Sequence, residues 1–242
     1  MSTNTHNTIV ITGANRGIGY AMAKICQQRG DTVYALCRQS SKDLDALGVN
    51  VVEQIEVATQ AGIDKAVSAL SGISIDLLIN NAGILRDEQL SDLNKDTIIE
   101  QFNVNALAPL CLSHALLANL SSGSKIALIT SRMGSVTDNT SGGRYGYRMS
   151  KAALNIAAVS LARDLSDENI AVGIYHPGYV QTEMVNSNGI LANGDISANV
   201  AADRLIALMD NLTMSDSGVF KHSNGETLPW YLYTNPYKKV IT

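Results

Sequence analysis

The chain contains 242 residues, of which 45% are hydrophobic and 17% are charged, and its formal net charge is −4. The apolar fraction is typical of a folded globular protein and excludes an intrinsically disordered chain. The slightly acidic balance argues against a dedicated nucleic-acid-binding protein, which normally carries an excess of basic residues.

No part of the sequence approaches the roughly 18 consecutive apolar residues that predict a transmembrane helix. Residues 1–7 lack the basic and apolar regions of a signal peptide, so we expect a cytoplasmic protein that does not associate with membranes. The three cysteines and four histidines are too scattered to predict a disulfide framework or a metal site.

Short apolar runs alternate with longer helical patterns along the chain. The predicted strands are 8–12, 32–37, 49–54, 75–79, 125–130, 170–175 and 218–221. The predicted helices follow a glycine-rich turn up to residue 29 and then span 60–71, 97–120, 145–165 and 198–212. Strands that are apolar throughout and alternate with helices indicate a parallel sheet covered on both faces.

The fold class that this pattern predicts is α/β, with a doubly wound parallel sheet of about seven strands. No linker or repeat interrupts the pattern, so we expect one domain over residues 1–242, with the last strand and a tail in 217–242.

A glycine-rich sequence follows the first predicted strand and opens the first helix, with the spacing Gly-x-x-x-Gly-x-Gly. Glycines at such a turn let the backbone approach a pyrophosphate, which the N–H groups and positive dipole end of the helix bind. A tight turn without a ligand is the alternative, but its place after the first strand favours a dinucleotide. The residues expected to contact it are Gly13, Asn15, Arg16, Gly17, Ile18 and Gly19.

The residue after the second strand distinguishes the two nicotinamide coenzymes. An acidic residue there binds the adenosine ribose hydroxyls of NAD, whereas an arginine accommodates the 2′-phosphate of NADP. The sequence has Cys37-Arg38 at this place, with no carboxylate before Asp43, and Arg16 lies within the glycine turn. These residues favour NADP(H) over NAD(H).

Three further motifs follow later strands. Asn80-Asn81-Ala82-Gly83 comes after the fourth strand, Ser131 ends the fifth, and Tyr147 and Lys151 lie one helical turn apart. Each motif is weak alone, since Tyr-x-x-x-Lys pairs occur by chance in many helices. In this order, and after the glycine turn, they resemble the short-chain dehydrogenase/reductase family from residue 8 to about residue 182. The resemblance implies a Rossmann-like enzyme that transfers a hydride between a nicotinamide and a carbonyl group.

The resemblance implies a catalytic role for each of these side chains. Tyr147 would protonate the alkoxide left by hydride transfer, and Ser131 would hydrogen-bond the carbonyl oxygen. Free tyrosine has a pKa of about 10, and the Lys151 ammonium is expected to lower it. Ser135 and Tyr145 are nearby alternatives, but only Ser131 lies at the strand end and only Tyr147 precedes a lysine by four residues.

The resemblance further implies that an asparagine in the helix after the fourth strand holds a water through its main-chain carbonyl, linking the lysine to solvent. Asn105 occupies that position. A helical carbonyl normally accepts from the N–H four residues later, and that residue is Pro109, which has no N–H. We therefore expect a kink and a free Asn105 carbonyl. A proline without catalytic consequence is the alternative.

More segments are implied to contact the coenzyme. Pro177-Gly178 after the sixth strand would face the nicotinamide, and Glu56-Val57 stands where the family commonly has Asp-Val beside the adenine. The implied contacts outside the glycine turn are Arg38, Glu56, Val57, Asn81, Ala82, Gly83, Tyr147, Lys151, Pro177, Gly178, Val180 and Thr182.

Residues 139–148 and the tail around 218–230 narrow the resemblance to the C-factor and Sniffer-type carbonyl reductase branch, whose members reduce aldehydes, ketones or quinones with NADPH. The expected partner is thus a small carbonyl compound, and the loop 185–196 is the expected substrate lid. Alanines in the 97–120 and 145–165 helices, where the family often forms interfaces, favour a homodimer or homotetramer. Alanines that simply pack on the sheet are the alternative.

A second hypothesis is a nucleotide-sensing or cell-signalling protein on the same scaffold. Loss of catalysis would normally remove Ser131, Tyr147 or Lys151, and all three are present. The sequence therefore favours an enzyme without excluding a signalling role.

Overall fold

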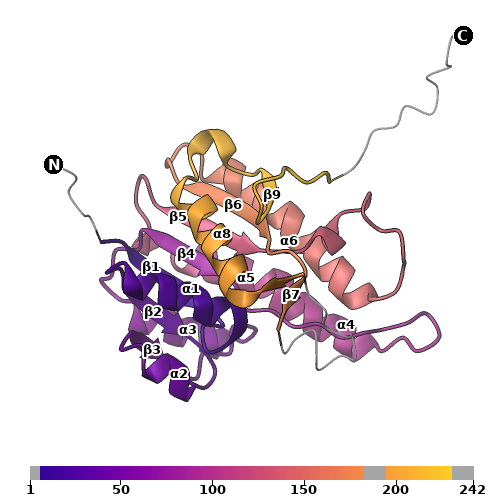
Figure 1. Ribbon diagram of the computed structural model, residues 1–242, viewed down its shortest axis with the longest axis horizontal. Coiled ribbons are helices and arrows are strands. Elements are labelled where there is room, and N and C mark those ends of the chain that lie inside the picture. Colours follow the sequence, from indigo (N-terminus) through magenta and orange to yellow (C-terminus); the bar gives the residue numbers. More distant parts are fainter. Residues whose placement is uncertain (1–5, 183–194, 231–242) are drawn as a thin grey trace, which may run out of the picture.

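The computed structural model describes residues 6–182 and 195–230 and is built on a parallel sheet of seven strands in the order β3-β2-β1-β4-β5-β6-β9 (Figure 1). Five strands, β1, β2, β4, β5 and β6, are buried over most of their length, as the apolar runs predict, whereas the two edge strands β3 and β9 are only partly buried. The strands are β1 (Thr8–Thr12), β2 (Thr32–Leu36), β3 (Asn50–Val52), β4 (Leu77–Asn80), β5 (Lys125–Ile129), β6 (Ala171–His176) and β9 (Phe220–His222). The doubly wound α/β fold expected from the sequence is confirmed.

Helices cover both faces of this sheet (Figure 1). Alternate side chains of each strand point to opposite faces, so Ile9 and Ile11 pack with α1 and α8 while Val10 packs with α3 and α5. The α-helices are α1 (Gly17–Gln28), α2 (Lys42–Asp45), α3 (Gln60–Ala69), α4 (Lys95–Phe102), α5 (Ala108–Ala115), α6 (Tyr145–Asp164) and α8 (Ala198–Asp210). A third cluster joins α6 to β5, β6 and β9.

The long helix predicted over 97–120 is interrupted. It consists of α4, a π-helical turn η1 (Asn103–Leu107), α5 and a 3₁₀ turn η2 (Leu117–Asn119). In the π-helical turn the Ala108 N–H bonds the carbonyl of Asn103, five residues earlier. Pro109, which follows directly, has no N–H to continue the ordinary ladder, and this accounts for a break at this place.

Five short elements go beyond the predicted ones: α2, the 3₁₀ turns η3 (Arg132–Gly134) and η4 (Met214–Asp216), and a separate pair of parallel strands, β7 (Val180–Gln181) and β8 (Ile196–Ser197). Most of the expected lid, 185–196, lies outside the described residues, as does 231–242 of the expected tail. Among the described residues, no helix is long and apolar enough to span a membrane.

Candidate active site

The sequence-predicted site residues converge on the carboxyl ends of β1, β4, β5 and β6. The chain order reverses between β1 and β4 in the sheet, because strands 2 and 3 lie on one side of β1 and the later strands on the other. In doubly wound folds this reversal leaves a crevice between neighbouring connections, where ligands bind. The topology therefore places the glycine turn and the later motifs around one crevice.

The glycine turn requires its glycines for steric reasons. Gly13 and Gly17 have φ angles of +65° and +56°, in the left-handed region that side chains disfavour. A side chain at Gly19 would overlap the Gly13 carbonyl oxygen, since α1 passes directly beneath the turn. Among the described residues, no side chain caps the first turn of α1. The first N–H groups of this helix, which lie at the crevice, therefore have no capping side chain as an acceptor.

Asn81 holds this turn in place rather than pointing freely into the crevice. Its side-chain Nδ2 donates to the carbonyls of Thr12 and Gly13 at 3.0 and 3.2 Å. The Thr12 hydroxyl in turn accepts from the N–H groups of Asn81 and Ala82, both at 3.0 Å. The segment after β4 and the glycine turn after β1 are thus cross-linked by four hydrogen bonds.

The predicted adenine-side residues also come together. Arg38 Nη1 lies 3.4 Å from Glu56 Oε2, and both side chains are substantially exposed. Asn15 Nδ2 donates to the Gln39 carbonyl, which brings the glycine turn against the segment after β2. A small recess at the ends of β1 and β4 is lined by Thr12, Val57, Asn80, Ala82, Val104, Ala108, Pro109 and Leu112.

Ser131, Tyr147 and Lys151 meet where β5 ends against α6. The Ser131 hydroxyl oxygen accepts from the Met133 N–H at 3.1 Å, which leaves its own proton available to donate. Lys151 is buried, and its ammonium donates to the Ile129 carbonyl at 3.0 Å and lies 5.8 Å from the centre of the Tyr147 ring. The alternative serine, Ser135, instead donates to the Pro229 carbonyl at 2.7 Å.

Burial has the largest effect on the pKa values of Tyr147 and Lys151. It raises the pKa of Tyr147 to about 12, against which a hydrogen bond with Ser131 acts in the lowering direction. Burial also lowers the pKa of Lys151 to about 8. The sequence led us to expect a tyrosine pKa lowered by the lysine. In the protein without coenzyme, desolvation of the phenolate outweighs any such effect.

Asn105 lies beside Tyr147 and Lys151, and the hydrogen bonds that connect it there are made by its side chain, whereas the sequence led us to expect a role for its main-chain carbonyl. It is fully buried, and its Oδ1 accepts from the Ile84 N–H at 2.8 Å while its Nδ2 donates to the Ile84 carbonyl at 2.8 Å. The same Nδ2 donates to Ser150 Oγ at 3.0 Å, and that hydroxyl donates to the Tyr147 carbonyl at 2.8 Å. A Cβ on Gly83 would lie 3.2 Å from Asn105 Oδ1 and 3.6 Å from Lys151 Nζ, so all three residues adjoin.

The segment after β6 also lies at this edge. Gly178 has φ +94°, and the Pro177 carbonyl accepts from Ser223 Oγ at 2.9 Å. Val180 is buried in β7, and Thr182 lies beside the glycine turn, with its Cγ2 3.6 Å from a Cβ built on Gly17. The structure thus brings the predicted nicotinamide-side and phosphate-side segments together.

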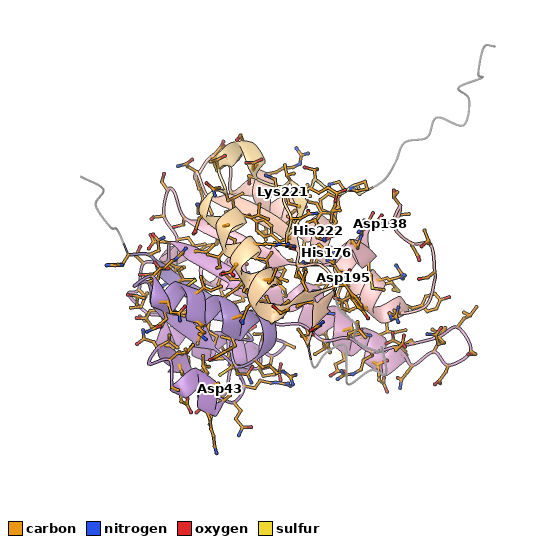
Figure 2. The ribbon with its side chains drawn as sticks, viewed as in Figure 1. Asp43, Asp138, His176, Asp195, Lys221 and His222 are labelled. Carbon is orange, nitrogen blue, oxygen red and sulfur yellow. The ribbon has the colours of Figure 1, made fainter. Side chains whose placement is uncertain are left out.

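Two histidines support this segment and were not predicted from the sequence. His176 and His222 pack edge to face with ring centres 5.0 Å apart (Figure 2), and the buried Nδ1 of His176 has no hydrogen-bond partner among the described residues. Burial, together with His222 and Arg132, lowers the pKa of His176 to about 3. Only the pairing of β6 with β9 brings the two rings together, so scattered histidines in the sequence give no signal.

In the described part of the molecule, neither the Cys26 and Cys37 thiols nor any group of metal-ligating side chains adds a second candidate site. Burial raises the pKa of Cys26 to about 12 and that of Cys37 to about 11, which makes both thiols poor nucleophiles. Over 6–182 and 195–230, no group of three or more histidine, cysteine, aspartate or glutamate side chains is placed to hold a metal ion.

Comparisons with known proteins agree with this geometry. The family model described as short chain dehydrogenase matches residues 7–190. The 1-hydroxy-2-glutathionyl-2-methyl-3-butene dehydrogenase of Rhodococcus sp. is 35% identical over 93% of this chain and 100% of its own. The C-signal of Myxococcus xanthus is 39% identical over 64% of this chain and 93% of its own.

Among solved structures, the NADPH-bound carbonyl reductase from chicken fatty liver superposes with a TM-score of 0.82 and 29% identity, covering 93% of this chain and 99% of its own. The matching fold, the motif order and the family model lead to the same assignment. The chain belongs to the short-chain dehydrogenase/reductase family and is an oxidoreductase scaffold of the Rossmann-like type.

Proposed function

We propose that this protein is an NADP(H)-dependent reductase of small carbonyl compounds, with Tyr147 as the proton donor. The observation that carries the proposal is the meeting of Ser131, Tyr147, Lys151 and Asn105 at one edge of the sheet, next to a glycine turn built for a dinucleotide. The similarity to an NADPH-bound carbonyl reductase supports the choice of reaction.

The residues present fit a nicotinamide dinucleotide. The uncapped first turn of α1 and the left-handed glycines offer N–H groups to a pyrophosphate, as a bound phosphate requires. Arg38 and Arg16 would contact a 2′-phosphate, and Pro177, Gly178, Val180 and Thr182 would line the nicotinamide end. When bound, the coenzyme supplies the hydride.

The side chains then divide the remaining work. The Ser131 O–H donates a hydrogen bond to the carbonyl oxygen, stabilising negative charge as it develops. Tyr147, whose pKa of about 12 keeps it protonated at neutral pH, delivers its proton to the same oxygen. Lys151, with a pKa near 8, exchanges protons close to physiological pH and can restore the tyrosine proton.

Asn105 supports this arrangement through its side-chain hydrogen bonds. The Asn105 side chain fixes Ile84 and, through Ser150, the first turn of α6. Its main-chain carbonyl would hold the water that connects Lys151 to solvent, since Pro109 cannot donate to it.

The proposal is tested by following the oxidation of NADPH, through the absorbance of its nicotinamide, in the presence of each member of a panel of aldehydes, ketones and quinones. The reverse reaction is assayed with NADP⁺ and alcohols, including a glutathione-conjugated alcohol, because one relative is named as a dehydrogenase of such a compound. Turnover with at least one carbonyl class is expected. Binding of NADPH with silence across both panels would contradict the proposal.

A second candidate is a signalling protein on the same scaffold, which the similarity to the protein named C-signal favours. The presence of all three catalytic side chains supports the enzyme instead. A signalling role without catalysis predicts that Tyr147→Phe leaves the biological response intact, whereas an enzymatic role predicts its loss.

We further propose a homodimer formed through α4, η1 and α6. These neighbouring helices carry exposed apolar side chains: Ile99 (45%), Phe102 (44%), Leu107 (44%), Met149 (58%) and Ile156 (66%). Of the alanines in these helices that could form an interface, three are buried inside the subunit and four are partly exposed: Ala106, Ala108 and Ala158 are buried, and Ala115, Ala152, Ala153 and Ala157 are partly exposed. Light scattering should give a dimer for the wild type and a monomer for Ile156→Glu. A monomeric wild type would contradict this.

A further inference from the structure

The helix that carries Tyr147 begins without a capping residue of its own. Arg144, at the N-cap of α6, has φ +51°, in the left-handed region, and its side chain makes no cap bond. The first N–H groups of a helix have no partner within the helix and need one from elsewhere. Tyr147 lies in this first turn, so whatever satisfies these groups also fixes its position.

Glu88, from the segment after β4, supplies the missing partner. Its Oε2 accepts from the Gly146 N–H at 3.2 Å, and its main-chain carbonyl accepts from the Arg144 N–H at 2.7 Å. Glu88 is 3% exposed, so this carboxylate is a buried cap delivered by a distant part of the chain. A negative charge at a helix N-terminus also interacts favourably with the helix dipole.

The second oxygen of Glu88 binds the neighbouring helix. Oε1 accepts from Thr97 Oγ1 at 2.8 Å and from Gln101 Nε2 at 2.5 Å, both on α4. Gln101 is fully buried and its own oxygen accepts from the Arg86 N–H at 2.9 Å. One carboxylate therefore joins α4, through Thr97 and Gln101, to the first turn of α6.

The two helices approach closely at this point. A side chain at Gly146 would overlap Gln101 Nε2 and lie 3.0 Å from both Glu88 Oε1 and the Ile98 Cα. No basic side chain lies within ion-pair distance of Glu88 in the described part of the chain, so hydrogen bonds alone compensate its charge. A buried carboxylate without a basic partner is tolerated only when both of its oxygens accept hydrogen bonds.

We propose that Glu88 is a positioning residue for Tyr147, acting as a clamp between α4 and α6 through both of its side-chain oxygens. The inference rests on the proposed function, in which Tyr147 is the proton donor. Both carboxylate oxygens act as acceptors, and an amide offers only one. A glutamine at this position must turn its NH₂ group either toward the Gly146 N–H or toward the Thr97 and Gln101 donors. Either way a buried donor faces a donor, and the first turn of α6 shifts.

Glu88→Gln tests the clamp, with Glu100→Gln as the matched control. Glu100 lies on α4, the helix that Glu88 contacts, and pairs with Arg86 at the surface, so its change removes one charge without touching α6. We expect Glu88→Gln to lower kcat about 10-fold or more, because small misplacement of a catalytic group is costly, and to change NADPH affinity less than twofold. Glu100→Gln should match the wild type in both.

The solvent deuterium isotope effect separates positioning from general damage. A misplaced Tyr147 makes proton transfer slower, so this isotope effect on kcat should increase in Glu88→Gln. A loss of folded protein alone would lower the measured rate but would leave the solvent isotope effect on kcat unchanged. If Tyr147→Phe abolishes turnover while Glu88→Gln keeps the wild-type kcat and isotope effect, the clamp is refuted and the proposed function stands. If Tyr147→Phe retains turnover, the proposed function itself fails.

Gly146→Ala provides the second variant, should Glu88→Gln not fold. Alanine has a higher helix propensity than glycine, so a role limited to helix stability predicts a neutral or stabilised protein with unchanged kcat. The clamp predicts the opposite, since the added methyl group separates α4 from α6. We expect reduced kcat with an increased solvent isotope effect, and wild-type kinetics in this variant would overturn the inference.

Discussion

Arg38 and Glu56 face each other across the edge of the proposed coenzyme site, with 3.4 Å between Nη1 and Oε2. The arginine is the residue that the sequence favoured for the 2′-phosphate of NADP, and the glutamate the residue placed beside the adenine. Both are exposed, so their attraction is weak and can be exchanged for a phosphate contact. The preference between NADPH and NADH can therefore be tested by substituting either Arg38 or Glu56.

Arg38→Asp should shift the ratio of kcat/KM from NADPH toward NADH. The substitution removes a cation that pairs with the phosphate and adds a carboxylate that repels it but accepts from ribose hydroxyls. Steady-state kinetics with both coenzymes measure the ratio. A wild type that already prefers NADH would contradict the interpretation of Arg38.

Glu56→Gln is expected to act in the opposite direction. Removing the carboxylate frees Arg38 from its partner and removes repulsion toward the phosphate, so the KM for NADPH should fall severalfold at low salt. The KM for NADH should change little, which serves as the internal control. Equal changes for both coenzymes would show that Glu56 does not act through Arg38.

Lys151→Met should stabilise the protein without coenzyme while abolishing its activity. The lysine pKa is lowered from 10.5 to about 8 by burial, so below pH 8 folding carries the cost of a buried charge. That cost disappears as the pH rises from 8 toward 10.5, because the unfolded chain binds the proton more tightly. Because each pKa unit corresponds to about 1.4 kcal/mol, we expect the free energy of unfolding to rise by about 3–4 kcal/mol at pH 7.

Urea unfolding at pH 7 and pH 10 measures this difference. The advantage of Lys151→Met over the wild type should shrink at the higher pH, and its turnover and NADPH affinity should both be reduced. A variant that is less stable than the wild type at pH 7 would show that the ammonium contributes more through its bond to Ile129 than its burial costs.

His176 should make the protein sensitive to acid. Its pKa is lowered from 6.5 to about 3, so between these values the unfolded state binds a proton that the folded state does not. The stability present above pH 6.5 is therefore lost as the pH falls, with a slope of up to about 1.4 kcal/mol per pH unit.

His176→Gln should flatten the acid side of the stability profile between pH 6.5 and pH 4, as followed by thermal unfolding. The exposed His6→Gln, which also removes one imidazole, is the control and should keep the wild-type slope. An identical slope in His176→Gln and the wild type would assign the acid sensitivity to other groups.

Pro109→Ala tests the role of the break between α4 and α5. Alanine restores the N–H that can bond the Asn105 carbonyl, so stability should be equal or higher while proton delivery to Lys151 slows. The kcat should fall, more strongly at low buffer concentration. Unaltered turnover across pH would favour a proline without catalytic consequence.

The strands along the chain and the glycine turn could be predicted from the sequence because they depend on local patterns, and the candidate catalytic residues because their motifs follow in the order typical of the family. Buried parallel strands are continuous apolar runs, Gly13 and Gly17 have left-handed φ angles that side chains disfavour, and Gly19 has no room for a Cβ. The interruption at Pro109 was expected for the same reason, since a missing N–H is a property of one residue. Its π-helical form was not, because the hydrogen bond five residues back depends on the packing around Asn105.

The parts that were missed depend on tertiary contacts. Glu88 stands between Asp87 and Gln89 in a polar stretch that is typical of a solvated loop, yet it is buried against α4 and α6. The expected lowering of the Tyr147 pKa by Lys151 was argued from helical spacing alone. Spacing says nothing about desolvation, which has the larger effect on both groups.

Single-turnover and steady-state rates of Tyr147→Phe, measured beside its NADPH affinity, test the central claim most directly. The substitution removes the hydroxyl and little else, so the dissociation constant for NADPH should stay within about twofold while kcat falls by about 100-fold or more, the usual loss for a general acid. Retention of most of the wild-type kcat, with NADPH still bound, would contradict the assignment of Tyr147 as proton donor.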